Sequence, residues 1–226
     1  MTDTPAHERN PRLTTPRAAA VAGIIFALLF AASLVFLRIS IPSDLTSEIE
    51  WIRQSRNYLS TALVLMPFAG IAFLWFIGVI RDRFGELEDR FFSTVFFGSS
   101  LLFIGMVFVA MAVAGALVAS VSVDGNYTIS QDVVVFGRAL MLQISNVYAL
   151  RMAGVLMFSL GTIWRHTQLM PRWLVGLTYL IAGALLLIIS LNLWVTLLFP
   201  AWVLLVSVYV LLQSHHGQSP VTARDT

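Results

Sequence analysis

Residues 92–119 read FSTVFFGSSLLFIGMVFVAMAVAGALVA, a run of 28 residues without a charged side chain. A helix needs about 20 consecutive apolar residues to cross the ~30 Å hydrocarbon core of a bilayer. This run is long enough by that measure, and it therefore predicts a transmembrane helix. Other stretches of the chain support the same interpretation.

The composition of the whole chain agrees with a membrane protein. Of its 226 residues, 58% are hydrophobic and 12% are charged, and the mean hydropathy is +0.83. A soluble domain carries about 25% charged residues, so we expect the exterior of this chain to face hydrocarbon. The chain has no cysteine, which excludes thiol catalysis, disulfides and thiolate metal sites. The net charge of +2 gives no support for nucleic acid as a partner.

The apolar runs predict an all-α fold, a polytopic transmembrane helix bundle of about six spans. The transmembrane domain covers residues 18–213, between an N-terminal tail (1–17) and a C-terminal tail (214–226) that we expect to be cytoplasmic. Only Ser190, Leu191 and Asn192 join the last two spans, which requires a tight hairpin. The predicted spans are residues 18–37, 58–80, 92–119, a part of 133–163, 173–189 and 193–212.

The arginines beside the spans predict the orientation. All 14 basic residues are arginines; nine lie in the two tails and in the second and fourth loops, against three in the first loop. Basic residues concentrate on the cytoplasmic side, so we expect both termini inside. The absence of lysine indicates a GC-rich genome. We therefore expect a multi-pass protein of a bacterial inner (plasma) membrane.

The fourth span carries polar residues at membrane depth. If Trp164 marks the inner interface, Arg151 lies about 20 Å into the bilayer and Arg138 lies near the outer surface, with Gln143 and Asn146 between them. A buried arginine keeps its charge and needs partners, yet no predicted span contains an acidic residue. We interpret these two arginines and two amides as candidate ligand-binding residues for an anion or a lipid headgroup. The alternative is a structural polar network that ties helices together.

Residues 38–57 form the one long loop on the predicted outer side, and we predict a short amphipathic helix in it. From this loop Glu48 or Glu50 would reach Arg138. The apolar stripe of the predicted helix consists of Ile41, Leu45, Ile49 and Ile52.

Prolines and small residues predict how the spans pack. Pro67 and Pro200 lie inside spans and should kink them, because proline removes a backbone donor. Small residues at every fourth position let a neighbouring helix approach closely. In the first span these are Ala19, Gly23, Ala27 and Ala31.

Several function classes lose support because the spans lack the side chains that they need. No histidine and no acidic residue falls inside a predicted span. Membrane haem sites need buried histidine, proton-coupled carriers need an intramembrane carboxylate, and zinc proteases need both at membrane depth. We expect no metal, no cofactor and no catalytic residue, and we rank an enzyme last.

We favour a protein that binds or transports an anionic ligand or a lipid through the polar fourth span. The alternative is a non-catalytic accessory or structural subunit that packs against a partner. A water-filled cavity that reaches Arg151 would favour the first function, and a dry bundle the second. Expected partners are the lipid bilayer, an anionic lipid or small anion, and a membrane protein partner or a second copy of the chain.

Two stretches of the sequence resemble known proteins: RDRFGELEDRFFSTVFFGSSLLF (residues 81–103) and MPRWLVGLTYLIAGALLL (residues 170–187). They resemble uncharacterised six-span integral membrane proteins of high-GC, actinobacterial-type bacteria, and the similarity extends over the full chain. The resemblance implies the membrane fold and a bacterial source. It brings no activity, ligand or site residue with it.

Overall fold

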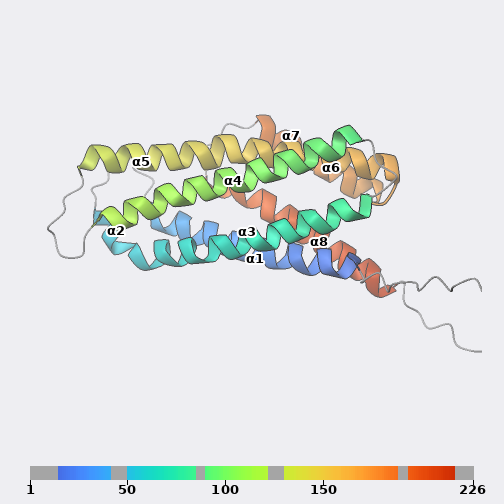
Figure 1. Ribbon diagram of the computed structural model, residues 1–226, viewed down its shortest axis with the longest axis horizontal. Coiled ribbons are helices and arrows are strands. Elements are labelled where there is room, and N and C mark those ends of the chain that lie inside the picture. The colour runs from blue at the N-terminus through green and yellow to red at the C-terminus, as the bar shows by residue number, and fades with distance from the viewer. Residues whose placement is uncertain (1–14, 42–49, 85–89, 122–129, 188–192, 217–226) are drawn as a thin grey trace, which may run out of the picture.

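A computed structural model of the chain describes residues 15–41, 50–84, 90–121, 130–187 and 193–216. Every regular element in these ranges is helical, as predicted (Figure 1). A π-helical segment, Ile144–Ala149, joins α5 to α6, and a 3-10 helix, Leu193–Leu197, leads into α8. The α-helices are α1 (Thr15–Ser40), α2 (Glu50–Gln54), α3 (Arg56–Phe84), α4 (Arg90–Ser120), α5 (Gln131–Gln143), α6 (Leu150–Thr167), α7 (Arg172–Leu187) and α8 (Leu198–His216).

Within the described ranges, five helical stretches are long and apolar enough to cross a membrane, which confirms a multi-span helical membrane protein. The predicted fifth span corresponds to α7, whose 16 residues make a helix of about 24 Å, shorter than the ~30 Å hydrocarbon core. The predicted hairpin at Ser190–Asn192 lies outside the described residues. The five candidate spans are Arg17–Ser40, Arg56–Arg81, Phe91–Ser120, Gln131–Thr167 and Val195–Gln213.

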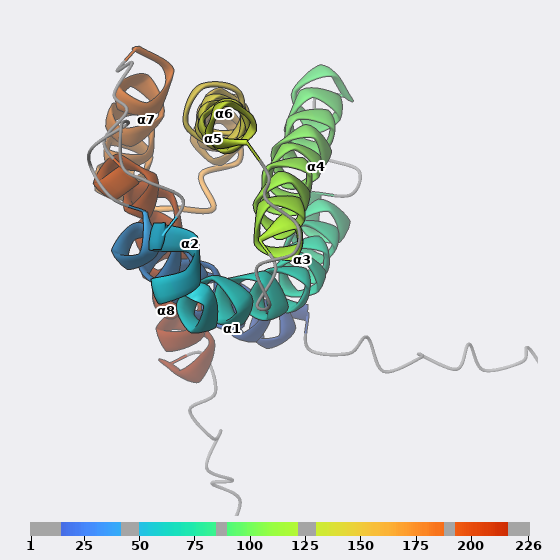
Figure 2. The same cartoon turned by 90° about the vertical axis from the view of Figure 1, so that its left-hand side faces the viewer.

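The helices are arranged around a shared centre. Seen along the bundle, α5 and α6 lie end-on between α4 and α7, and α1, α3 and α8 form the opposite side (Figure 2). In the ring, α1 contacts α3, α3 contacts α4, α4 contacts α6, and α6 contacts α7, while α8 packs on α1. The contact that closes the ring, between α7 and α8, is slight. It includes a hydrogen bond of 2.9 Å that the Trp202 Nε1–H donates to Thr178 Oγ1.

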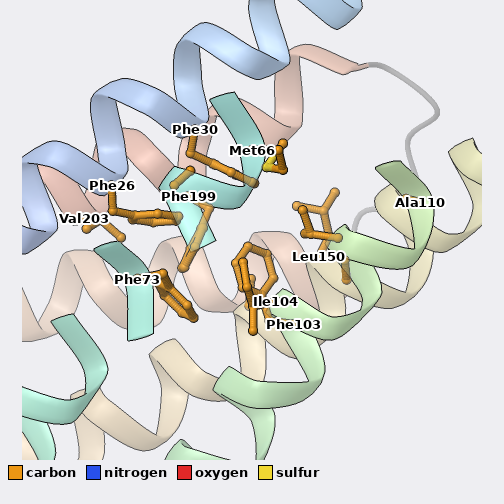
Figure 3. Close-up of a cluster of buried hydrophobic side chains, with 14 of the residues drawn as sticks. Phe26, Phe30, Met66, Phe73, Phe103, Ile104, Ala110, Leu150, Phe199 and Val203 are labelled. Atoms are coloured by element: carbon orange, nitrogen blue, oxygen red, sulfur yellow. The ribbon is translucent and has the colours of Figure 1, made fainter. Parts of the chain in front are cut away.

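An aromatic cluster fills the middle of the bundle (Figure 3). Phe26, Phe73, Phe103 and Phe199 come from α1, α3, α4 and α8, and each side chain is at most 2% exposed. Their ring centroids approach to between 4.7 and 6.2 Å, mostly in edge-on geometry. Each aromatic pair contributes about 0.5–1.5 kcal/mol beyond its buried area. The cluster therefore holds four helices in register.

The small residues of α1 form a packing seam, as predicted. Ala19 and Ala27 are buried. A Cβ atom added at Gly23 would overlap the Ser207 hydroxyl of α8 and the Phe76 ring of α3. The seam therefore lets α1 approach two neighbours at once.

The two prolines occupy different environments. Pro67 lies inside α3, where the sequence predicted it. Before Pro200 the chain is 3-10 helical over Leu193–Leu197 and becomes α-helical at Leu198, and the kinks expected at both prolines stay predictions. Pro200 thus lies in the first turn of α8. The first four N–H groups of an α-helix have no partner within the helix, so proline interrupts no hydrogen bond there.

Candidate functional site

The fourth predicted span is one continuous helical rod of 37 residues, Gln131–Thr167. A rod of this length measures about 55 Å, so it extends beyond the ~30 Å hydrocarbon core. The π-helical segment Ile144–Ala149 interrupts the rod near its middle, and it coincides with the predicted cluster of polar residues.

The π-helical segment shifts the buried face of the rod by one residue. In α5 the buried residues Arg138 and Met141 follow α-helical spacing, which would continue at positions 145 and 148. Instead Asn146 and Ala149 are buried, and Tyr148 is 52% exposed. A π-helix bonds residue i to residue i+5 and thus accommodates one extra residue. The shift turns Asn146 into the bundle and Tyr148 out of it.

Polar side chains stabilise this segment through its own main chain. Ser145 Oγ donates a hydrogen bond of 2.9 Å to the Met141 carbonyl oxygen. Arg151 Nη1 donates one of 2.9 Å to the Val147 carbonyl oxygen, inside the π-helical segment. Arg151 is half-buried. The guanidinium of Arg151 is therefore paired with a backbone carbonyl, because the predicted spans contain no acidic residue that could pair with it.

Asn146 is the buried amide of the segment, with 5% of its surface exposed. Its Oδ1 lies 3.4 Å from Ser145 Oγ, whose single proton is directed to the nearer Met141 carbonyl oxygen. Its Nδ2 is buried and has no hydrogen-bond partner among the described residues. An amide nitrogen carries two donors, and a buried polar group left unsatisfied costs about 1–3 kcal/mol. The Asn146 amide is therefore ready to bind an acceptor.

An internal cavity lies beside Asn146. The centres of water-sized groups can occupy a volume of about 40 Å³ in it. One water requires about 10–15 Å³ by this measure, so the cavity holds about three such groups. Its wall is mostly aromatic and aliphatic, with Ser145, Asn146 and Thr196 as the polar members. The surrounding helices appear in Figure 3, which labels the wall residues Phe30, Met66, Phe103, Ala110, Leu150 and Phe199.

Arg138 lies near one end of the rod rather than at the cavity. Its side chain is 4% exposed, and its guanidinium carbon lies 5.9 Å from the centre of the Trp51 ring of α2. Trp51 and Ile52 of α2 are buried, whereas Arg53 and Gln54 are exposed; the longer amphipathic helix expected in this loop stays a prediction. The described contact of Arg138 is thus a cation–π contact.

Glu48 and Glu50 are the acidic partners predicted for Arg138. Glu48 and the side chain of Glu50 lie outside the described residues, as do Leu45 and Ile49 of the predicted apolar stripe.

The four candidate residues do not converge on one site. Asn146 lines the cavity, but Arg138, Gln143 and Arg151 are not among its wall residues. Gln143 is exposed on the surface of the rod, and Arg138 precedes Asn146 by eight residues, or about 12 Å along the helix. A water-filled cavity that reaches Arg151 would have favoured binding or transport of an anion; the cavity beside Asn146 does not have Arg151 in its wall.

Sequence reasoning missed one polar residue of the cavity. Thr196 belongs to the 3-10 helix before α8, and it is 5% exposed. A lone threonine in an apolar run gives no signal of its own. Its position four residues after a predicted hairpin was the available hint.

The described residues contain no group of three histidine, aspartate or glutamate side chains that could hold a metal ion. The polar atoms at the cavity are one amide and two hydroxyls. Such groups donate and accept hydrogen bonds without carrying charge. The arrangement is therefore suited to binding a neutral polar group in apolar surroundings.

Because the comparisons with known proteins find no match, inference of function rests on the fold and on the geometry of the cavity at Asn146. The resemblance to six-span actinobacterial-type proteins thus stays a prediction, as does the bacterial source. No protein-family model, no curated protein and no solved structure matches the chain.

Proposed function

We propose that this membrane protein binds a small uncharged molecule from the bilayer in its central cavity, with Asn146 as the hydrogen-bond donor. The observation that carries the proposal is the Asn146 Nδ2, which is buried beside the cavity without a partner among the described residues. Membrane proteins pair their buried polar groups because hydrocarbon offers them no water. A ligand with a carbonyl or hydroxyl oxygen would supply the missing acceptor.

The cavity wall favours an uncharged ligand over an anion. Apart from three polar side chains the wall is aromatic and aliphatic, and transferring an unpaired ion into such surroundings is costly. The guanidinium of Arg151 donates to Val147 and that of Arg138 faces Trp51. Anion binding at these arginines, which the sequence favoured, stays a prediction with less support than a neutral ligand.

The size of the cavity limits what enters it. Space for about three water-sized groups accommodates a few heavy atoms. The ligand is then either a very small molecule or one polar group of a longer lipid-soluble molecule. Ligand sites of this type are commonly apolar with a few placed polar groups.

The test is to extract the purified protein with organic solvent and to identify bound small molecules by mass spectrometry. The variant Asn146→Leu removes the donor and fills the cavity. The matched control is Gln143→Leu, which removes an exposed amide one turn away on the same rod. We expect a neutral compound on the wild type and on the control, and its loss from Asn146→Leu.

Stability separates this proposal from a simple folding defect. Without ligand, Asn146→Leu should be at least as stable as the wild type, because it removes an unsatisfied buried amide. A well-folded Asn146→Leu variant that retains the compound would refute the proposal. So would a wild-type protein that carries no organic molecule, since water alone would then satisfy Asn146. The second outcome would favour the alternative of an accessory subunit.

A further inference from the structure

The short connection between α6 and α7 carries two exposed arginines at one end of the bundle (Figure 1). Arg165 lies in the last turn of α6, and Arg172 is the first residue of α7. Between them Gln168 adopts a left-handed conformation (φ 52°) that ends α6. α7 then packs on α6, and packed helices have axes about 8–10 Å apart. The two arginines therefore belong to one small patch of the surface.

These two side chains differ from the other described arginines in their contacts. Neither guanidinium makes a hydrogen bond or an ion pair with the part of the chain that the structure describes. Arg172 also lies at the start of a helix, where a positive charge is unfavourable because this is the positive end of the helix dipole. Every other described arginine side chain makes an interaction within the protein: Arg17, Arg38, Arg53, Arg56, Arg81, Arg138 and Arg151.

The neighbours of the two arginines are apolar and exposed. Leu169 is 52% exposed and Trp173 is 57% exposed. The sequence contains no acidic residue between Asp132 and Asp225, so the turn has no acidic neighbour along the chain. Tryptophan at the end of a span prefers the boundary between hydrocarbon and headgroups. The turn thus combines cations that lack a partner with apolar side chains suited to a membrane surface.

We propose that the α6–α7 turn binds the headgroups of anionic phospholipids through Arg165 and Arg172. The planar guanidinium pairs with phosphate through two parallel hydrogen bonds. The candidate span Gln131–Thr167 ends at this turn, so the turn lies at the depth of the headgroups. Arg165 is about 28 Å from Asn146 along the rod, and the proposal does not rest on the proposed function.

The apolar neighbours favour a lipid surface over an acidic segment of a soluble partner. Either would neutralise the two arginines. A lipid surface also receives exposed apolar side chains at the boundary between headgroups and acyl chains, and it surrounds the ends of every membrane span. Leu169 and Trp173 therefore find their place in the same environment as the arginines.

The test is native mass spectrometry of the full chain in detergent, titrated with phosphatidylglycerol and with phosphatidylcholine of identical acyl chains. Arg165→Gln and Arg172→Gln should each weaken phosphatidylglycerol binding about fivefold, the contribution of one basic residue beside an anionic lipid surface. The double variant should lose about 25-fold, and phosphatidylcholine binding should stay nearly unchanged. The matched control is Arg81→Gln, an exposed arginine whose guanidinium lies 4.4 Å from the centre of the Phe97 ring.

Three outcomes would overturn the proposal. If the double variant binds phosphatidylglycerol as well as Arg81→Gln does, the two arginines serve only to orient the spans. If inorganic phosphate at the lipid concentration displaces phosphatidylglycerol from the wild type, the site takes a soluble anion. If a protein co-purifies with the wild type and is lost from the double variant, the partner is an acidic protein segment. Circular dichroism of the double variant should show wild-type helix content, because both side chains are exposed.

Discussion

Replacing Gly154 with alanine tests the seam between the fourth span and α7. A Cβ atom at Gly154 would lie 2.8 Å from Leu186 Cγ and 3.1 Å from the main-chain oxygen of Ala182, closer than the 3.4–4 Å of ordinary contacts. The Leu186 side chain can change rotamer, but the Ala182 carbonyl moves only with α7. Overpacking costs about 1–3 kcal/mol, and the better helix propensity of alanine offsets about 1 kcal/mol. We therefore expect the free energy of unfolding to fall by up to about 2 kcal/mol.

The measurement is equilibrium unfolding by sodium dodecyl sulfate in mixed micelles, followed by helical circular dichroism. Gly183→Ala is the matched control on α7, because a Cβ atom there meets nothing within 4 Å. It should be neutral or stabilising by up to about 1 kcal/mol.

A double-mutant cycle separates the two contacts of Gly154. Adding Leu186→Ala to Gly154→Ala should recover part of the loss, with a coupling energy of about 0.5 kcal/mol or more. The rest of the loss belongs to the Ala182 carbonyl. If Gly154→Ala proves as stable as Gly183→Ala, the two helices do not pack at this glycine and the reasoning is refuted.

Three further predictions follow from described contacts. Deleting Ile144 from the π-helical segment should leave a folded protein of near wild-type helix content, because the buried face then continues with α-helical spacing; loss of folding, measured by circular dichroism, would contradict this. Thr178→Val removes the acceptor of the buried Trp202 Nε1–H and should lower the unfolding free energy by about 1–3 kcal/mol, whereas an unchanged midpoint would rule the bond out. In this cysteine-free chain, Gln54→Cys should react with an impermeant thiol reagent outside intact cells and Gln168→Cys should not; the reverse labelling would invert the predicted orientation.

The helical bundle was predictable because hydrocarbon imposes a strong constraint on the sequence. Backbone groups in a bilayer must pair within a helix, so long apolar runs reveal the spans directly. The limits of this signal appear at α7, where the apolar run 173–189 predicted a span but the described helix Arg172–Leu187 is short. Apolar composition marks residues that avoid water. It does not by itself fix the length of a helix.

The site was only partly predictable, because burial on one helix depends on its register. The sequence identified the polar cluster of the fourth span and named Asn146. It did not predict which of the polar residues face inward, since the α-helical spacing that is normally assumed fails at Ile144–Ala149. With that spacing Tyr148 would be buried, yet it is 52% exposed. The residue types alone do not indicate where a π-helix adds one residue to the helical turn.

The polar residues at membrane depth divide into two roles once this register is known. Ser145 and Arg151 donate to carbonyl oxygens of their own helix, so their hydrogen-bonding needs are met where the chain departs from α-helical geometry. Asn146 lies between them and lines the cavity, and its Nδ2 has no hydrogen-bond partner among the described residues. An arginine in that place would have demanded a counter-charge. An amide demands only an acceptor, so the cavity at the centre of this bundle, which has no charged side chain in its wall, is suited to a neutral ligand.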